Sequence, residues 1–462
     1  MTGPQATPHD LVGVGIGPFN LSLAALADGV PGLSTLFLDE KPAFSWHPGM
    51  LLDGATLQVP FLADLVTLAD PVSPWSYLNY LREHDRLFPF YFTERFHIPR
   101  REYEHYCRWV AGSLPACRGS AHVDALAWDA GRELFEVCFT DASTGERHAV
   151  LARDVVLGIG TAPTVPDALR PVLGERAFHS AGFLDRRAGL SGARDVTVIG
   201  SGQSGAEVFL DLLRTPPSEG ARLRWLTASP AFAPMEYSKL GLEHFTPDYT
   251  RYFRTLPEPT RDRLVPSQWQ LHKAISQETI AQIYDLLYDR AASGASTPAV
   301  LMPNIEVAGS HSGPDGIELV CRHVEQGREF RVRTDAAVLA TGYVPRRPAL
   351  LDPLADLIDW DERGRYRVDA DYRVALRPDV AGRVYVQNAE LHTHGVGAPD
   401  LGLGAHRAAV ILNSVTGRAV YRLPQRTAFT DFGVSESEPE PEPEPESPSP
   451  APEVLDAPAH AR

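Results

Sequence analysis

Two stretches of this sequence repeat one pattern, in which an apolar strand runs through a glycine-rich turn into an amphipathic helix. The first reads DLVGVGIGPFNLSLAALA from Asp10, and the second reads ARDVTVIGSGQSGAEVFLDLL from Ala193. Glycines let the backbone turn tightly, and the helix N-terminus then presents free N–H groups to a pyrophosphate. The repetition predicts an α/β fold with two Rossmann-like dinucleotide-binding domains.

The order of the segments predicts that the second domain is inserted in the first. A chain of 462 residues exceeds what one hydrophobic core usually serves. We expect the first domain to comprise residues 1–170 and 335–432, and the second to comprise residues 190–334. Residues 230–293 break the α/β rhythm with aromatics and helix formers, which predicts a small helical region at the substrate pocket. Residues 433–462 alternate Glu with Pro, so we expect a disordered acidic tail.

The composition excludes several classes of protein. The formal net charge is −16, whereas nucleic-acid binding needs a basic surface. No apolar run reaches the roughly 18 residues that span a bilayer, and the polar start lacks signal-peptide features, so we expect a cytoplasmic protein without membrane contact. None of the four cysteines forms a C-x-x-C pair, which removes a dithiol redox centre and an obvious metal site.

The first glycine turn carries the features of a flavin nucleotide site. Gly13, Gly15 and Gly17 stand between strand and helix, and Asn20 occupies the place of the last glycine in G-x-G-x-x-G. An acid about 20 residues further on is expected to bond the ribose hydroxyls, and Asp39 in LFLDE supplies it. With Asp39 at the expected distance, the motif is stronger evidence for a dinucleotide site than a glycine turn alone.

The second turn matches G-x-G-x-x-G at every glycine and is expected to hold the nicotinamide cofactor. Its next strand, RLRWLTAS, ends without an acid, and an acid there would repel the 2′-phosphate of NADP. NADPH is therefore favoured over NADH. The expected NADP contacts are Gly200, Gly202, Gln203, Ser204, Gly205 and Thr227.

Several further motifs resemble one enzyme family. They are DEKPAFSWHPGM from Asp39, LQVPFLADLVTLADPVSPWSYLNYL from Leu57, GSGQSGAE from Gly200, ATGY from Ala340 and HTHGVGAPDLGLGAHR from His392. Together they strongly resemble the N-hydroxylating flavin monooxygenases of hydroxamate siderophore biosynthesis, which hydroxylate lysine, ornithine or diamines. The resemblance extends to about Arg426 and excludes the tail.

The resemblance implies a reaction and further contacts. NADPH reduces FAD, O2 adds to the reduced flavin as a C(4a)-hydroperoxide, and an uncharged amine takes up the distal oxygen. This chemistry needs no histidine base, so we assign no catalytic residue and expect His392 and His394 to be structural. The FAD contacts that the family implies are Trp46, His47, Gln58, Pro399, Asp400 and Leu401.

The chain departs from the amino-acid hydroxylases at three positions. Ala63 stands where their F-L-K-D-L motif has lysine, Leu242 replaces an asparagine, and Gly402 replaces a serine. The polar contacts to an amino-acid headgroup are therefore missing. A buried carboxylate without a partner costs several kcal/mol. The substrate is expected to be an aliphatic diamine, putrescine or cadaverine, as in the diamine branch of the family.

The distal ammonium of a diamine needs an acid, for which Asp64, Glu243 and Asp400 are candidates. L-lysine or L-ornithine N-hydroxylation remains the alternative, and a non-catalytic flavin redox sensor is a second. A Baeyer–Villiger monooxygenase is disfavoured, since the linker AFHSAGFLD lacks the F-x-G-x-x-x-H spacing. The resemblance suggests a homo-oligomer, dimer or tetramer, and leaves the preferred diamine open.

Overall fold

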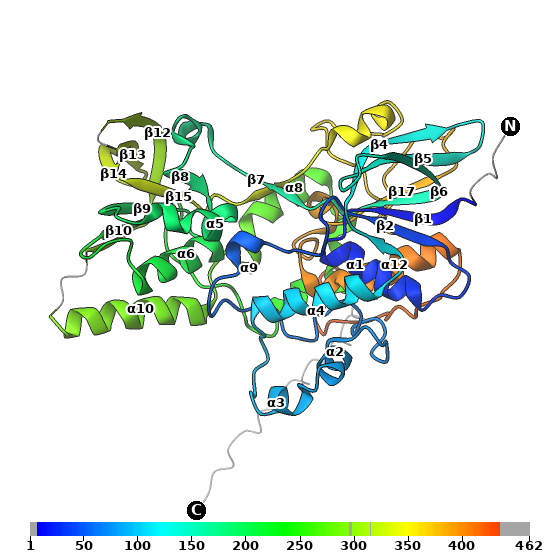
Figure 1. The fold of residues 1–462 in the computed structure, drawn as a ribbon, viewed down its shortest axis with the longest axis horizontal. Coiled ribbons are helices and arrows are strands. Elements are labelled where there is room, and N and C mark those ends of the chain that lie inside the picture. The colour runs from blue at the N-terminus through cyan, green and yellow to red at the C-terminus, as the bar shows by residue number, and fades with distance from the viewer. Residues whose placement is uncertain (1–6, 295–297, 315, 435–462) are drawn as a thin grey trace, which may run out of the picture.

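The computed structural model describes residues 7–294, 298–314 and 316–434. It contains two main sheets, each with its own helices (Figure 1). The expected tail lies outside the described residues, apart from Gly433 and Val434. Within the described ranges, no helix has both the length and the apolar character needed to cross a membrane.

The first sheet contains the first glycine-turn unit. Its strands follow the order β3 (Cys117–Arg118), β2 (Thr35–Leu38), β1 (His9–Val14), β6 (Arg147–Leu157), β5 (Leu134–Asp141) and β4 (Ala121–Asp129), with β17 (Arg383–Val386) also on β6. β6 pairs in parallel with β1 and β17 through its second half, and antiparallel with β5 through its first half. The second half is therefore enclosed on both sides, which explains its unbroken apolar run VVL.

Helices cover one face of this sheet. α1 (Pro18–Asp28), α4 (Arg100–Ser113) and α12 (Gly404–Thr416) share a core with β1 and β2. The remaining short elements are α2 (Tyr77–Glu83), α3 (Leu87–Tyr91), α5 (Phe183–Arg186), η1 (Pro48–Met50), η2 (Asp167–Val172), η3 (Ser180–Gly182), η4 (Arg187–Leu190), η5 (Gly241–Phe245), η6 (Ala349–Leu354) and η7 (Leu401–Leu403).

The second sheet is entirely parallel and contains the second glycine-turn unit. Its order is β11 (Ala299–Met302), β10 (Arg222–Leu226), β9 (Asp195–Ile199), β15 (Ala336–Leu339) and β8 (Ala177–His179). A three-stranded antiparallel sheet of β12 (Ile305–Gly313), β13 (Gly316–His323) and β14 (Arg328–Thr334) stands beside it.

The sheet pairing moves two predicted domain boundaries. β15 pairs with β9 and β8, so the second sheet includes a strand that the sequence assigned to the first domain from residue 335. β8 also belongs to the second sheet, although it precedes residue 190. Alternating strands and helices look alike in either domain, and only the pairing partner decides where a strand belongs. β7 (Thr161–Pro163) and β16 (Tyr343–Pro345) pair antiparallel where the chain enters and leaves the second domain.

The helical region predicted over residues 230–293 divides between the two domains. α7 (Pro247–Thr255) and α8 (Glu258–Ser267) pack against α11 (Leu391–His394) of the first domain. After the short α9 (Trp269–His272), α10 (Gln277–Ala292) packs against α6 (Gln203–Arg214) of the second. Phe253 on α7 is buried with Val396, whereas Ile283 on α10 joins the core of the second domain. The apolar face of each helix selects its own partner.

Candidate functional site

Both glycine turns need glycine at their first position. Gly15 has φ of +88° and Gly200 has φ of +125°, a left-handed region that other residues rarely adopt. A Cβ on Gly15 would lie 2.6 Å from the carbonyl oxygen of Gly158, and one on Gly200 would lie 2.1 Å from that of Ala340. In each domain the turn therefore presses against the residue that follows the neighbouring parallel strand.

The second glycine of each turn begins a helix whose N-terminus is uncapped. Gly17 before α1 has φ and ψ of −84° and 176°, and Gly202 before α6 has −83° and 178°. Neither helix has a side-chain cap at its first N–H groups. A Cβ on Gly17 would meet its nearest atom at 3.8 Å, so the space in front of α1 is open. Free N–H groups facing open space fit a pyrophosphate at the first turn. At the second turn a Cβ on Gly202 would lie 3.3 Å from the oxygen of Lys273, so the space there is narrower.

Asn20, predicted to contact the cofactor, instead supports the turn from inside. Its Nδ2 donates to the carbonyl oxygen of Gly15 at 2.8 Å, and its Oδ1 accepts from Gln387 Nε2 at 2.7 Å. The side chain is fully buried. Its counterpart in the second turn is Gly205, where a Cβ would lie 2.5 Å from the oxygen of Gly200. The first turn therefore accommodates a side chain at this position, whereas the second turn has no room for one.

Gly13 and Asp39 also serve the first turn through protein contacts. Gly13 lies within β1, and a Cβ there would come 2.1 Å from the ring of Phe37. Asp39 follows β2, as predicted, and its carboxylate accepts from the backbone N–H of Ile16 at 2.7 Å and of Lys41 at 2.9 Å. Asp39 thereby ties the glycine turn to the end of β2.

At the second turn, Gln203 has no amide atom left for a ligand. Its Oε1 accepts from the N–H of Ser276, and its Nε2 donates to Thr279 at 3.0 Å and to Glu207 at 3.0 Å. The Gln203 side chain therefore fixes the start of α10, and its contact with NADP stays a prediction. Ser204 lies half-buried in the first turn of α6, and Thr227 is buried directly after β10.

Trp46 and His47 lie where the two domains meet. Their rings pack edge to face at 4.9 Å, and the His47 ring lies 5.9 Å from that of Tyr343, which follows the second domain. Desolvation by surrounding protein, and then the charge of Arg100, lower the pKa of His47 to about 4. Its side chain nevertheless keeps solvent-accessible surface. His47 is exposed beside Trp46, and contact of this pair with the flavin ring stays a prediction.

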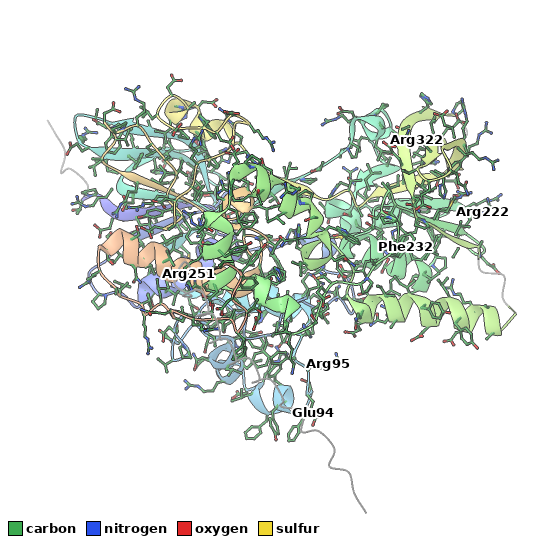
Figure 2. The ribbon with its side chains drawn as sticks, turned by 180° about the vertical axis from the view of Figure 1, so that it is seen from behind. Glu94, Arg95, Arg222, Phe232, Arg251 and Arg322 are labelled. Atoms are coloured by element: carbon green, nitrogen blue, oxygen red, sulfur yellow. The ribbon has the colours of Figure 1, made fainter. Side chains whose placement is uncertain are left out.

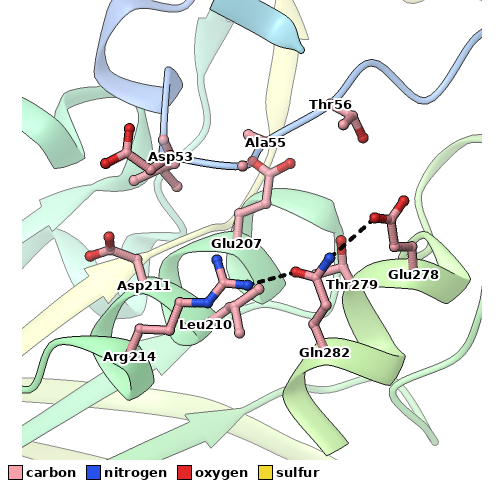
Figure 3. A pocket seen from close by; sticks show the side chains of 12 residues that line it. Asp53, Ala55, Thr56, Glu207, Leu210, Asp211, Arg214, Glu278, Thr279 and Gln282 are labelled. Atoms are coloured by element: carbon pink, nitrogen blue, oxygen red, sulfur yellow. Dashed lines mark hydrogen bonds between the residues drawn. The ribbon is translucent and has the colours of Figure 1, made fainter. Parts of the chain in front are cut away.

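A buried ion pair joins the two domains close to His47. Arg100, at the start of α4, donates to both carboxylate oxygens of Glu207 on α6, at 2.7 and 2.9 Å, and to the oxygen of Met50 at 2.8 Å. Figure 3 shows Glu207 facing residues 53–56 across a cavity of about 20 Å³. That volume holds about one water molecule, so the cavity is a seam between domains rather than a ligand site. In the sequence, Arg100 is indistinguishable from a surface arginine.

Five residues from separate segments form a second cluster. A Cβ on Gly402 would lie 3.9 Å from the Cβ of Ala63 and 2.8 Å from Asp400 Oδ1, which accepts from the Gly402 N–H at 2.7 Å. Tyr237 donates from its hydroxyl to the backbone oxygen of Gln58 at 3.1 Å. Burial, and then the charge of Asp400, raise the pKa of Tyr237, which places the two close together. Burial raises the pKa of Asp400 itself to about 6.

The structure places Gly402 beside both Ala63 and Asp400, and the role of these residues at a substrate pocket stays a prediction. Pro399 and Leu401 flank Asp400, with Pro399 exposed and Leu401 packed on the core of the first domain. Tyr237 was missed, since a lone tyrosine in a helical region carries no signal of its own.

The other acidic candidates have structural partners. Asp64 accepts from the backbone N–H groups of Val66, Thr67 and Tyr77, and from the Thr67 hydroxyl. Glu243 accepts from the N–H groups of residues 429 and 430 and from the Thr430 hydroxyl. Its carboxylate thereby anchors the end of the described chain. Leu242 beside it is exposed, and its position against a substrate stays a prediction.

The loop that carries Asp400 is held by a second buried ion pair. Arg407 on α12 bonds Glu390 at 2.8 Å and donates to the oxygen of Ala398 at 2.6 Å. Both charged groups are almost fully buried. His394 nearby stacks on Tyr372 at 4.4 Å, and burial lowers its pKa well below the usual value. These contacts are structural, and they position residues 398–402.

Comparison with known proteins decides the family. The family model for L-lysine 6-monooxygenase/L-ornithine 5-monooxygenase matches residues 7–345. The chain belongs to this family. It is 46% identical to the rhizobactin siderophore biosynthesis protein RhbE of Rhizobium meliloti, over 93% of this chain and 96% of that protein. It is 42% identical to the putrescine N-hydroxylase of Shewanella oneidensis, over 94% and 86%.

A solved structure agrees with this relationship. The FAD-bound cadaverine monooxygenase DfoA of the desferrioxamine pathway from Erwinia amylovora superposes with a TM-score of 0.90 at 41% identity, covering 94% of this chain and all of that one. The predicted fold class and the predicted enzyme class, a flavin-dependent N-hydroxylating monooxygenase, are both confirmed.

Proposed function

We propose that this enzyme hydroxylates one primary amine of an aliphatic diamine, putrescine or cadaverine, with FAD, NADPH and O2, in the biosynthesis of a hydroxamate siderophore. The observation that carries the proposal is the wall formed by Ala63, Gly402 and Asp400. It offers the carboxylate of Asp400, and Ala63 and Gly402 place no polar side chain beside it. The relatives named for putrescine and cadaverine support the same substrate class.

Each of the two glycine turns binds one cofactor. The first turn, with Gly15 and Gly17 ahead of α1, holds the FAD pyrophosphate, and the second, with Gly200 and Gly202 ahead of α6, holds that of NADPH. Each helix N-terminus adds a partial positive charge to its free N–H groups. Both Rossmann turns bind at the carboxyl ends of parallel strands, which is the usual place for dinucleotides in such sheets.

Bound FAD, reduced by NADPH, supplies the activation of O2, and the protein supplies the surroundings. Trp46 packs edge to face at 5.3 Å on Tyr103, which is buried in the core of the first domain and so holds the Trp46 ring in place. His47 stays neutral above a pH of about 4 and adds no charge there. A cleft with few free charges excludes water and favours the uncharged form of the reacting amine.

Asp400 holds the other end of the substrate. A diamine must present one neutral nitrogen for hydroxylation, while its distant nitrogen remains an ammonium ion. Asp400 pairs with that ammonium, and the pairing lowers its own pKa in the complex. The α-carboxylate of lysine or ornithine would instead face the carboxylate of Asp400, and Ala63 and Gly402 offer it no side-chain donor.

A substrate screen tests the proposal. FAD-loaded enzyme is given NADPH with putrescine, cadaverine, L-lysine or L-ornithine, and NADPH oxidation and hydroxylamine product are both measured. We expect coupled product formation with the diamines and little with the amino acids. Coupled hydroxylation of lysine or ornithine with none of the diamines contradicts the substrate assignment. FAD binding without amine-stimulated turnover supports the redox-sensor alternative instead.

A further inference from the structure

The second domain lies to one side of the first and meets it along a seam that includes η1. Figure 2 shows Arg222 in the second domain and Arg251, on α7, against the first. η1 belongs to the chain of the first domain, yet Met50 is buried in the core of the second. A Cβ on Gly49 would lie 2.0 Å from the backbone oxygen of Ala181. The two domains are therefore in close contact at η1.

The ion pair of Arg100 and Glu207 adds a directional contact to this seam. Arg100, at the start of α4, donates to both carboxylate oxygens of Glu207 on α6, at 2.7 and 2.9 Å, and to the oxygen of Met50 at 2.8 Å. The two side chains are only 9% and 6% exposed. A buried pair contributes little net stability but has a defined geometry, because two parallel hydrogen bonds restrict rotation. The pair therefore fixes the orientation of α6 relative to α4 as well as their distance.

Hydrogen bonds extend from this pair to the second glycine turn. Gln203 directly follows Gly202 and begins α6, about one helical turn before Glu207. Its Nε2 donates to Glu207 at 3.0 Å and to Thr279 on α10 at 3.0 Å. Any movement of Glu207 therefore also moves the residue at which the turn enters its helix.

The pair is also connected to the loop that the family resemblance places at the flavin. The N–H of Met50 donates to the backbone oxygen of His47 at 2.8 Å, and the oxygen of Met50 accepts from Arg100. Trp46 and His47 are the residues for which contact with the flavin ring is predicted. Arg100 thus connects this loop with the helix behind the second turn.

We propose that Arg100 and Glu207 are positioning residues for the reduction of FAD by NADPH. They hold the second glycine turn at the distance and angle from the flavin at which hydride transfer occurs. One hydride, with both electrons, passes from the nicotinamide to the flavin, so that NADPH is oxidised to NADP+ and FAD is reduced. The proposal rests on the assignment of FAD to the first turn and NADPH to the second, and is independent of which amine is hydroxylated.

Small rotations between the domains are enough to change this step. The reacting atoms must approach within about 3–3.5 Å, and a misplacement of about 1 Å can lower a rate about 100-fold. A domain of roughly 150 residues has a radius of gyration of about 15 Å, so a rotation of about 4° moves an atom at that radius by about 1 Å. Loss of the two parallel bonds should permit about half of this displacement, which corresponds to a decrease of about tenfold.

Anaerobic stopped-flow spectroscopy of the FAD-loaded enzyme tests the proposal. E207Q keeps the size of the side chain and removes its charge. We expect its limiting rate constant for flavin reduction at saturating NADPH to fall about tenfold, while chemically reduced E207Q reacts with O2 at the wild-type rate, because that reaction uses no hydride donor. A loss of folded protein would instead lower the amplitude of both reactions and leave their rate constants unchanged.

The matched control is D154N, which makes the same acid-to-amide change in another buried ion pair. Asp154 on β6 pairs with Arg383 on β17 inside the first domain, and its side chain is 3% exposed. D154N should reduce its flavin at the wild-type rate. The proposal is overturned if E207Q does so too, if D154N slows equally, or if the reaction of E207Q with O2 slows to the same extent. A weaker affinity of E207Q for NADPH with an unchanged limiting rate constant also overturns it.

Amide hydrogen exchange without NADPH measures the seam directly. R100K keeps its charge opposite Glu207 but lacks the planar fork that bonds both carboxylate oxygens. We expect the N–H of Met50 to exchange faster in R100K and E207Q than in the wild type, and to be unchanged in D154N. Wild-type exchange in R100K and E207Q contradicts the positioning role. An error in the assignment of the turns is detected separately, since G17A would then bind FAD as tightly as the wild type.

Discussion

Replacing Asp400 with Asn removes one charge from the pocket and leaves its shape. The Asn Oδ1 still accepts the N–H of Gly402, which the carboxylate accepts at 2.7 Å, so the turn at η7 keeps its cap. The contact to a substrate ammonium loses its charge. Hydrogen bonds to charged groups contribute about 1.5–3 kcal/mol, and each 1.36 kcal/mol changes a rate tenfold. We therefore expect kcat/KM for putrescine to fall by about tenfold to 150-fold in D400N.

The loss should lie mainly in KM, because the ammonium is remote from the nitrogen that reacts. The acid limb of the pH profile gives a second signature. Burial raises the pKa of Asp400 to about 6 in the free enzyme, and only the ionised form attracts an ammonium. The kcat/KM of the wild type should rise with pH through about 6, and D400N should lack this limb.

Stability separates a binding role from a structural one. The folded-state pKa of Asp400 is raised above its ordinary 3.8, so the carboxylate ionises first in the unfolded chain. Folding stability from this group is therefore lost as the pH rises from about 4 to about 6, by at most roughly 3 kcal/mol. D400N removes this cost and should keep or raise the Tm at pH 8.

The assay is putrescine-dependent hydroxylamine formation with E243Q as the matched control. Glu243 was an equal candidate in the sequence, but its carboxylate is engaged by residues 429 and 430. E243Q should keep the kcat/KM of the wild type within about threefold, the size of an ordinary surface effect. A kcat/KM of D400N within twofold of the wild type would refute the assignment of Asp400.

The remaining predictions concern the turns, the domain seam and the chain end. G15A should lose folding and FAD together, because it combines φ of +88° with a 2.6 Å clash, whereas G17A should fold and bind FAD more weakly, as flavin fluorescence of the purified variants will show. R100M should lower the free energy of unfolding by about 3–5 kcal/mol in urea titrations, since it leaves Glu207 buried and unpaired; R100M within 1 kcal/mol of the wild type contradicts this. Bonds from the chain end lower the pKa of Glu243, so its contribution is present above its ordinary pKa and is lost as the pH falls through the lowered value. E243Q should accordingly lower the Tm at pH 7 and converge with the wild type in acid, and equal melting curves at pH 7 would contradict that.

The local chemistry of the turns was readable from sequence, because it depends on neighbours along the chain. Gly15, Gly17, Gly200 and Gly202 stand within a few residues of the strand and helix that they join. Their spacing was enough to predict two α/β domains, whereas the enzyme family was predicted from the resemblance of longer motifs such as DEKPAFSWHPGM. The structural role of the Asn20 side chain was not readable, since its partner Gln387 lies 367 residues away and no local pattern indicates it.

The predicted substrate residues were found partly from polar groups that the chain lacks at motif positions. Ala63 and Gly402 were noticed because each lacks a polar group at a motif position, and the structure brings them within contact of Asp400. The choice among three acids was not possible from sequence. Asp64 and Glu243 have their oxygens engaged by backbone N–H groups, and only the folded chain distinguishes such a carboxylate from one facing a cleft.

The sequence by itself determined the two nucleotide folds, because glycine conformation and apolar periodicity act over a few residues. The tertiary structure alone decided that β15 belongs to the second sheet, that Arg100 pairs with Glu207 between domains, and that Gly402 lies against both Ala63 and Asp400. Each of these depends on groups far apart in the chain. Their free energy comes from burial and pairing, which exist only once the chain has folded.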